Sequence, residues 1–103
     1  AAELWRTTHD KIYNEYFVNH YPDYRLALDM PAPEGWREVA PMALWTYALG
    51  AVKGADASLI AEIRTRTTQA SRAIVESTRK TPYRVSLRAK DYVWGSNGVA
   101  ANY

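Results

Sequence analysis

The sequence predicts an all-α fold of about four helices joined by long loops. Apolar residues recur at helical spacing in three segments, and proline and glycine residues separate these segments. The alternation at Val85-Ser86-Leu87 is too short to indicate a sheet. A length of 103 residues and a hydrophobic content of 48% fit one small domain or part of a larger one, and exclude a disordered chain.

The first predicted helix covers residues 1 to about 19. Its apolar side chains share one broad stripe: Leu4, Trp5, Ile12, Tyr13, Tyr16 and Phe17. Tyr21-Pro22-Asp23 is expected to end this helix, because proline cannot continue the hydrogen-bond ladder. A long loop then reaches Gly35, and ordered loops of this length often carry function.

The second predicted helix runs from about Glu38 to Leu49, with Pro41 tolerated in its first turn. Its apolar residues occupy every face: Val39, Met42, Leu44, Trp45, Tyr47 and Leu49. A helix that is apolar all round must be enclosed on all sides, and about two other helices are too few to enclose it. We therefore expect further packing partners and a chain cut from something larger.

The third predicted helix follows Gly50 and Gly54, with Asp56 or Ser58 as its N-cap. Its apolar stripe comprises Leu59, Ile60, Ile63, Thr67, Ala70 and Ile74. Thr81-Pro82 is expected to end it, and an irregular basic segment follows over 83–90. The turn Trp94-Gly-Ser-Asn97 then precedes a small-residue run that predicts the start of another helix.

The aromatic composition favours rings that carry a polar group, with four Trp and eight Tyr against one Phe. Such rings suit wet, partly apolar surfaces, where the ring packs and its N–H or O–H finds a partner. Clefts that bind sugars have this character, and so do protein interfaces. A tryptophan directly before a helix-opening turn, as at Trp94, is placed to meet a ligand.

Several classes of site and partner are disfavoured by the composition. Zero cysteines exclude disulfides and thiolate metal sites, and His9 and His20 lack partners at metal-ligand spacing, so we expect no metal and no cofactor. The basic residues of 64–90 are interrupted by acidic ones and the net charge is only +2, so we expect no nucleic-acid partner. The sequence shows no membrane span and no signal peptide.

Four short motifs, in order, resemble glycoside hydrolase family 9, the cellulase-type inverting enzymes. They are Ala1-Ala-Glu-Leu-Trp5, Gly35-Trp36-Arg-Glu-Val39, Pro82-Tyr83-Arg-Val85 and Tyr92-Val-Trp94-Gly-Ser-Asn97. The resemblance covers essentially the whole chain and rests mainly on the Trp-Gly-Ser-Asn turn. It implies that residues 1–103 are a middle segment of a catalytic domain, a partial six-fold α/α barrel that is secreted or periplasmic.

The same resemblance implies that Trp36 and Trp94 line a cleft and stack on glucosyl units of a β-glucan or cello-oligosaccharide. Tyr24, on the long loop, is a further candidate for contact with the glycan. Many members of the family carry a substrate-contacting Arg four residues after the second tryptophan. This sequence has Gly98 there, which puts one hydrogen-bonding contact in doubt.

We expect no catalytic residue within the 103 positions. Inverting hydrolysis needs a general base and a general acid roughly 6.5–9.5 Å apart. The family's Asp-Ala-Gly-Asp and Asn-Glu motifs, which supply them, are absent here. The alternative is a small helical protein-interaction module or self-associating scaffold without enzymatic activity, since the same apolar surface can bind the remainder of a catalytic domain or a second copy.

Overall fold

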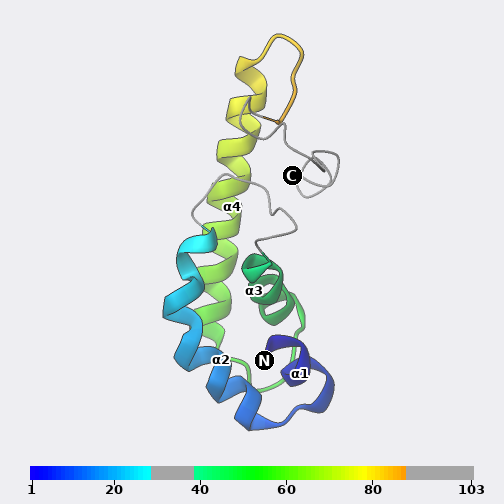
Figure 1. The fold of residues 1–103 in the computed structure, drawn as a ribbon, viewed down its shortest axis with the longest axis vertical. Coiled ribbons are helices and arrows are strands. Elements are labelled where there is room, and N and C mark those ends of the chain that lie inside the picture. Colours follow the sequence, from blue (N-terminus) through cyan, green and yellow to red (C-terminus); the bar gives the residue numbers. More distant parts are fainter. Residues whose placement is uncertain (29–38, 88–103) are drawn as a thin grey trace.

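The computed structural model describes residues 1–28 and 39–87, which contain four α-helices, one short 3-10 helix and no strand. The helices are α1 (Ala2–Thr8), α2 (Lys11–Tyr24), α3 (Ala40–Leu49) and α4 (Ala57–Lys80), and the 3-10 helix is η1 (Arg25–Leu28) (Figure 1). The predicted all-α class is confirmed. The predicted Trp94 turn, the helix after it and the loop segment containing Trp36 lie outside the described residues.

The prediction of one helix over residues 1–19 is wrong, because the helix is interrupted at His9 and Asp10. His9 has a left-handed backbone with φ of 58°, and its N–H donates to the Trp5 carbonyl at 3.0 Å, which ends α1. Asp10 then caps α2, its carboxylate accepting from the Ile12 N–H at 3.1 Å. The predicted apolar stripe therefore does not form one continuous buried face: Trp5 and Phe17 are buried, whereas Ile12 is exposed.

The predicted helix end at Tyr21-Pro22-Asp23 is also wrong. Pro22 lies inside α2, which continues to Tyr24 and leads directly into η1. Proline removes one backbone hydrogen bond, but Tyr21 and Leu28 on either side of it are buried and hold the segment against the core. Tyr24 therefore ends a helix instead of lying in a long loop.

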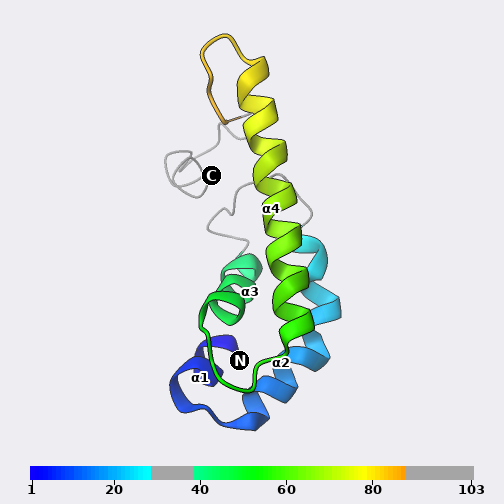
Figure 2. The ribbon, with the colours of Figure 1, turned by 180° about the vertical axis from the view of Figure 1, so that it is seen from behind.

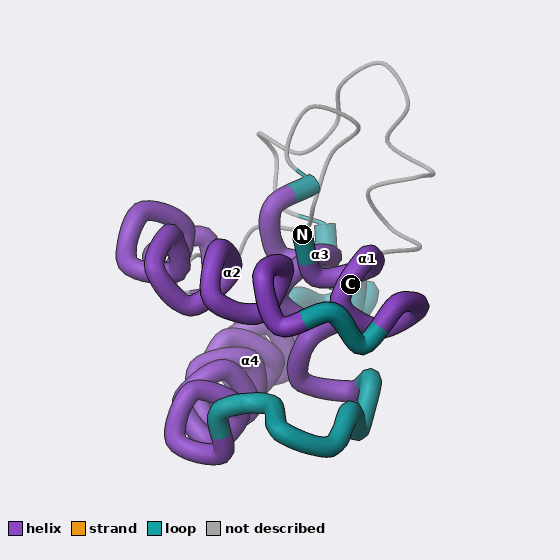
Figure 3. The backbone as a smooth tube through the Cα atoms, turned by 90° about the horizontal axis from the view of Figure 1, so that it is seen from below, coloured by secondary structure: helices purple, strands orange, loops and turns teal. Residues whose placement is uncertain are grey.

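The core lies where α1, α2 and η1 pack around α3 and the first turns of α4. Tyr47, Leu44 and Ile63 are its largest fully buried side chains, and the Tyr47 ring stacks on Phe17 with 4.2 Å between ring centroids. Seen from below, α1 and α3 lie on one side and α2 and α4 on the other (Figure 3), and α3 packs on both α1 and α4. Burial of each such side chain is worth about 1.5–3 kcal/mol.

One face of α3 is left exposed among the described residues. Pro41 lies in the first turn, as predicted, and Leu44, Tyr47 and Ala48 are buried. Met42 is 55% exposed and Leu49 is 72% exposed, although both are large and apolar. The prediction that two or so helices cannot enclose α3 is confirmed for the part of the chain described.

The third predicted helix is confirmed as α4, with the expected cap and end. Asp56 accepts hydrogen bonds from the N–H groups of Ser58 and Leu59, at 2.9 and 3.0 Å. Its C-terminal half extends beyond the other labelled helices (Figures 1 and 2). Of its predicted stripe, Leu59 and Ile63 are buried whereas Ile74 is only partly so, because the packing partners lie beside the first turns.

Candidate functional site

Tyr24 belongs to an exposed aromatic row on α2, formed by Tyr16, His20 and Tyr24. These residues are four positions apart, which places them on one face of a helix. The rings of Tyr16 and His20 stack with 4.0 Å between centroids, and Tyr16 and Tyr24 are 57% and 54% exposed. The row offers aromatic faces to solvent, as a surface that contacts a flat or apolar ligand requires.

A hydrogen bond to the backbone fixes the orientation of the central ring of the row. His20 Nδ1 lies 2.8 Å from the Tyr16 carbonyl oxygen, four residues earlier on the same helix. Because a carbonyl only accepts, Nδ1 is the donor and carries the proton. The Nε2 atom of His20 remains available as a polar group beside the two tyrosine rings.

The aromatic row forms one wall of a pocket of about 180 Å³ between α2, α1 and α3. Phe17 and Leu44 contribute apolar surface to the pocket, and four alanines also line it: Ala1, Ala2, Ala40 and Ala43. A lining of aromatic and small side chains leaves space for a ring-sized group.

Beneath the row, Tyr21 carries a buried hydroxyl that has no hydrogen-bond partner among the described residues. Burial, and secondarily the nearby Glu62 carboxylate, raises the pKa of Tyr21 above its ordinary value. The charged side chains around it are those of Glu62, Arg66 and Arg25, and Glu62 and Arg66 form an ion pair at 2.9 Å. Tyr21 is therefore held neutral between α2 and α4.

The tryptophans of the first and second predicted helices, Trp5 and Trp45, differ in burial. Trp5 is 4% exposed and its Nε1 has no hydrogen-bond partner among the described residues. Trp45 is half-buried, and its Nε1 donates to Thr67 Oγ1 of α4 at 3.1 Å. Trp5 belongs to the core, whereas Trp45 packs on the edge of the core and keeps part of its ring exposed.

The described acidic residues have identifiable structural roles in most cases. Asp10 and Asp56 cap helices, and three glutamates form ion pairs with arginines of the same helix: Glu3, Glu62 and Glu76. Among residues 1–28 and 39–87, no group of three His, Cys, Asp or Glu side chains is positioned to hold a metal ion. No helix in these ranges is long and apolar enough to cross a membrane.

Of the three residues predicted to contact the glycan, only Tyr24 lies within the described residues. Trp36 and Trp94 lie outside the described residues, whereas Tyr24 lines the α2 pocket. Tyr16 and His20, which stand beside Tyr24, were not predicted as site residues. Their spacing of four residues was visible in the sequence, but Tyr24 was assigned to a loop, so the row was missed.

The chain is similar over 99 residues to two Endoglucanase D sequences of Acetivibrio thermocellus, each 29% identical to it. The chain resembles a segment of an endoglucanase. The aligned region is 96% of this chain and 15% of each Endoglucanase D, so the chain spans about 15% of the length of the relatives it matches. No protein-family profile matches the chain, and no solved structure matches it.

Proposed function

We propose that the chain is a segment of a glycoside hydrolase family 9-like catalytic domain that acts on a β-1,4-glucan. The observation that carries the proposal is the similarity to Endoglucanase D along nearly the whole chain. The Trp94-Gly-Ser-Asn97 turn and the three preceding motifs, all of which resemble this family, support it from the sequence. In this proposal the catalytic base and acid come from other parts of the domain.

The helical architecture is compatible with the proposed six-fold α/α barrel, in which consecutive helices pack side by side. α1 packs on both α2 and α3, and α3 packs on α4. The exposed apolar face of α3 would then meet further helices of the barrel, which explains why Met42 and Leu49 are not covered. Secretion or export to the periplasm is part of the same proposal.

Glycan binding is proposed to use Trp36 and Trp94 by stacking, and Tyr24 through the α2 pocket. The C–H groups of a pyranose face pack on an aromatic ring, while its hydroxyls need polar partners. At Tyr24 both kinds of group are close together, since the row supplies tyrosine hydroxyls and the His20 Nε2.

Substitution of the aromatic residues tests this proposal. Trp94→Ala is expected to weaken cello-oligosaccharide affinity by about 1–3 kcal/mol, and Tyr24→Ala by a smaller amount because its ring is half exposed. Tyr83→Ala is the matched control, since this ring is 90% exposed and does not line the α2 pocket. Equal dissociation constants for the parent and Trp94→Ala, measured by calorimetry, would remove Trp94 from the site.

The second candidate function is a helical interaction module without enzymatic activity. The exposed Met42 and Leu49 favour it, because large apolar side chains gathered on one face mark interaction surfaces. Folded, associating protein that does not respond to cello-oligosaccharides would support this function over glycan binding.

A further inference from the structure

The α2 pocket has the size of a single ring. Its volume of about 180 Å³ compares with about 150 Å³ for an apolar cavity that holds a benzene molecule. Phe17 and Leu44, which line it, are buried in the core, so part of its wall is in place before a ligand arrives. A pre-formed space of this size is suited to one rigid ring.

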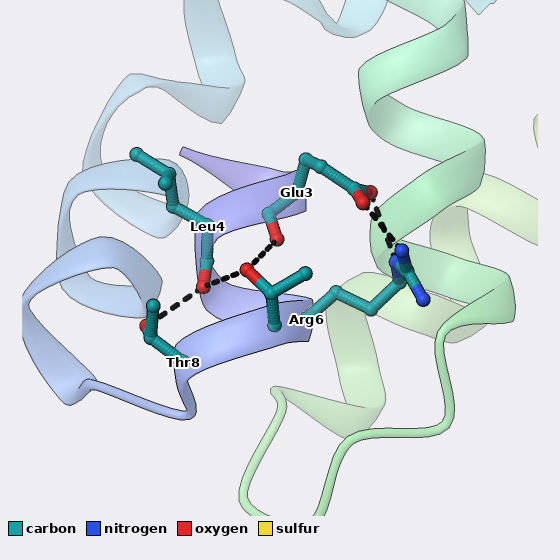
Figure 4. A network of polar contacts seen from close by, with 5 residues as sticks. Glu3, Leu4, Arg6 and Thr8 are labelled. Atoms are coloured by element: carbon teal, nitrogen blue, oxygen red, sulfur yellow. Dashed lines mark hydrogen bonds and ion pairs between the residues drawn. The ribbon is translucent and has the colours of Figure 1, made fainter.

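The α2 pocket is also suited to a neutral ligand. The described residues that line it include no Asp, Glu, Lys or Arg. On α1, Glu3 and Arg6 pair with each other (Figure 4), and they line a separate hollow together with Met42. An ionised group in the α2 pocket would therefore lose hydration without gaining a partner of opposite charge.

Much of the pocket lining has no polar side-chain atom, and this favours an aromatic ring over a sugar ring in the interior. The residues without such an atom include Ala2, Phe17, Ala40, Ala43 and Leu44. A pyranose carries hydroxyl groups around its rim, and each one enclosed beside these residues would lose water without gaining a hydrogen bond. An aromatic ring with a single hydroxyl has only one such group to satisfy.

His20 supplies the partner for that single hydroxyl. Its Nδ1 donates to the Tyr16 carbonyl oxygen at 2.8 Å, so in the neutral imidazole Nε2 is an acceptor. His20 is half-buried and lines the pocket, and no described residue donates to its Nε2. A ligand must therefore bring a donor to this atom, and a phenolic O–H is such a donor.

We propose that the α2 pocket binds a small phenol, with its ring against the aromatic row and its hydroxyl donating to His20 Nε2. Offset and edge-to-face contacts with the tyrosine rings hold the phenol ring, as aromatic pairs prefer. This inference goes beyond the proposed glycan binding and does not depend on it. A glucosyl unit would pack on the exposed ring of Tyr24, whereas the phenol occupies the interior of the pocket.

Titration of p-cresol into the chain, followed by two-dimensional proton–nitrogen NMR, tests the site. The amide signals of His20, Ala40 and Ala43 are expected to shift until they saturate, at concentrations that leave the circular dichroism unchanged. The methyl ether of p-cresol is the matched ligand, since it keeps the ring and lacks the O–H donor. It is expected to bind about fivefold to tenfold more weakly, because the hydrogen bond to Nε2 is lost.

Two substitutions test the contacts one at a time. His20→Phe keeps an aromatic ring beside Tyr16 and removes the acceptor, so it is expected to abolish the preference for p-cresol over its methyl ether. Ala43→Leu fills the pocket from an exposed position and is expected to weaken p-cresol binding about tenfold or more. Ala61→Leu is the matched control, because Ala61 is exposed on α4 and does not line the pocket. Circular dichroism of each variant establishes that it has kept the helical content of the parent.

Saturable binding of p-cresol, weaker binding of the ether and loss of affinity in Ala43→Leu but not in Ala61→Leu would support the proposal. A parent whose pocket amides do not respond to p-cresol would overturn it. Unchanged affinity in Ala43→Leu would also overturn it, since the ring would then lie elsewhere. So would equal affinities of the parent for p-cresol and its ether, because the hydroxyl would then not donate to His20. None of these results bears on cello-oligosaccharide binding, which is measured separately.

Discussion

The Tyr47 hydroxyl joins three elements of the fold, and its removal is the sharpest test of how the helices are held together. It donates to Asn14 Oδ1 of α2 at 2.6 Å and accepts from the Asp56 N–H, at the start of α4, at 2.9 Å. The Tyr47 side chain itself is 2% exposed and stacked on Phe17. Tyr47→Phe keeps the ring and removes only these two hydrogen bonds.

We expect Tyr47→Phe to lower the free energy of unfolding by about 2 kcal/mol. Each hydrogen bond contributes about 1 kcal/mol net, and the Asp56 N–H is left without this partner when the oxygen is removed. In a domain of this size, such a loss lowers the unfolding midpoint by on the order of 10 °C. Urea titration followed by far-UV circular dichroism measures the change.

Tyr16→Phe is the matched control, because the Tyr16 hydroxyl makes no hydrogen bond within the described residues and the ring is largely exposed. It is expected to change the free energy of unfolding by less than about 0.5 kcal/mol. If Tyr47→Phe were no more destabilising than Tyr16→Phe, the hydroxyl would not be joining α2, α3 and α4, and the reasoning would be refuted.

Two predictions concern pH. Burial raises the pKa of Tyr47 and of Tyr21 in the folded state, whereas tyrosine in the unfolded chain ionises near pH 10. The two neutral hydroxyls therefore contribute to the stability of the fold below about pH 10, and this contribution is lost as the pH rises through the folded-state pKa. Urea titrations at about pH 8 and about pH 11 should show a smaller alkaline loss in Tyr21→Phe than in the parent, and equal losses would contradict this. The Ser58 side chain, and then the Leu59 N–H, lowers the pKa of Asp56, so its stabilising effect is present above about pH 4 and lost as pH falls through the folded pKa. Asp56→Ala should reduce the helicity at neutral pH, and its free energy of unfolding should fall less on acidification than that of the control Asp23→Ala, in which an exposed carboxylate is removed. An unchanged dependence of the free energy of unfolding on acidic pH in Asp56→Ala would show that the cap does not stabilise α4.

Local hydrogen-bonding rules predicted the helix boundaries that are marked by a capping residue or a proline. Asp56 caps α4 and Thr81-Pro82 ends it because these residues act through their own backbone and nearest neighbours. Pro41 was likewise placed correctly in the first turn of α3. Such features need no knowledge of tertiary packing.

The errors arose where tertiary packing or a missed local cap decided the outcome. Thr8-His9-Asp10 contains a capping aspartate, but the apolar stripe on both sides of it favoured one continuous helix. At Pro22 the burial of Tyr21 and Leu28 outweighs the lost hydrogen bond, and this burial is not visible in a local pattern. The second error hid the aromatic row, because Tyr24 shares a face with Tyr16 and His20 only if α2 continues past Pro22.

The central proposal is that this segment binds β-1,4-glucan, and a titration tests it most directly. Cello-oligosaccharides would be added to the purified chain while tryptophan fluorescence is followed, with circular dichroism establishing that the sample is helical. The account predicts a saturable change in fluorescence, because tryptophan is proposed to stack on glucosyl units. A helical sample whose fluorescence stays constant over the full range of cello-oligosaccharide would contradict the claim that this segment binds glycan.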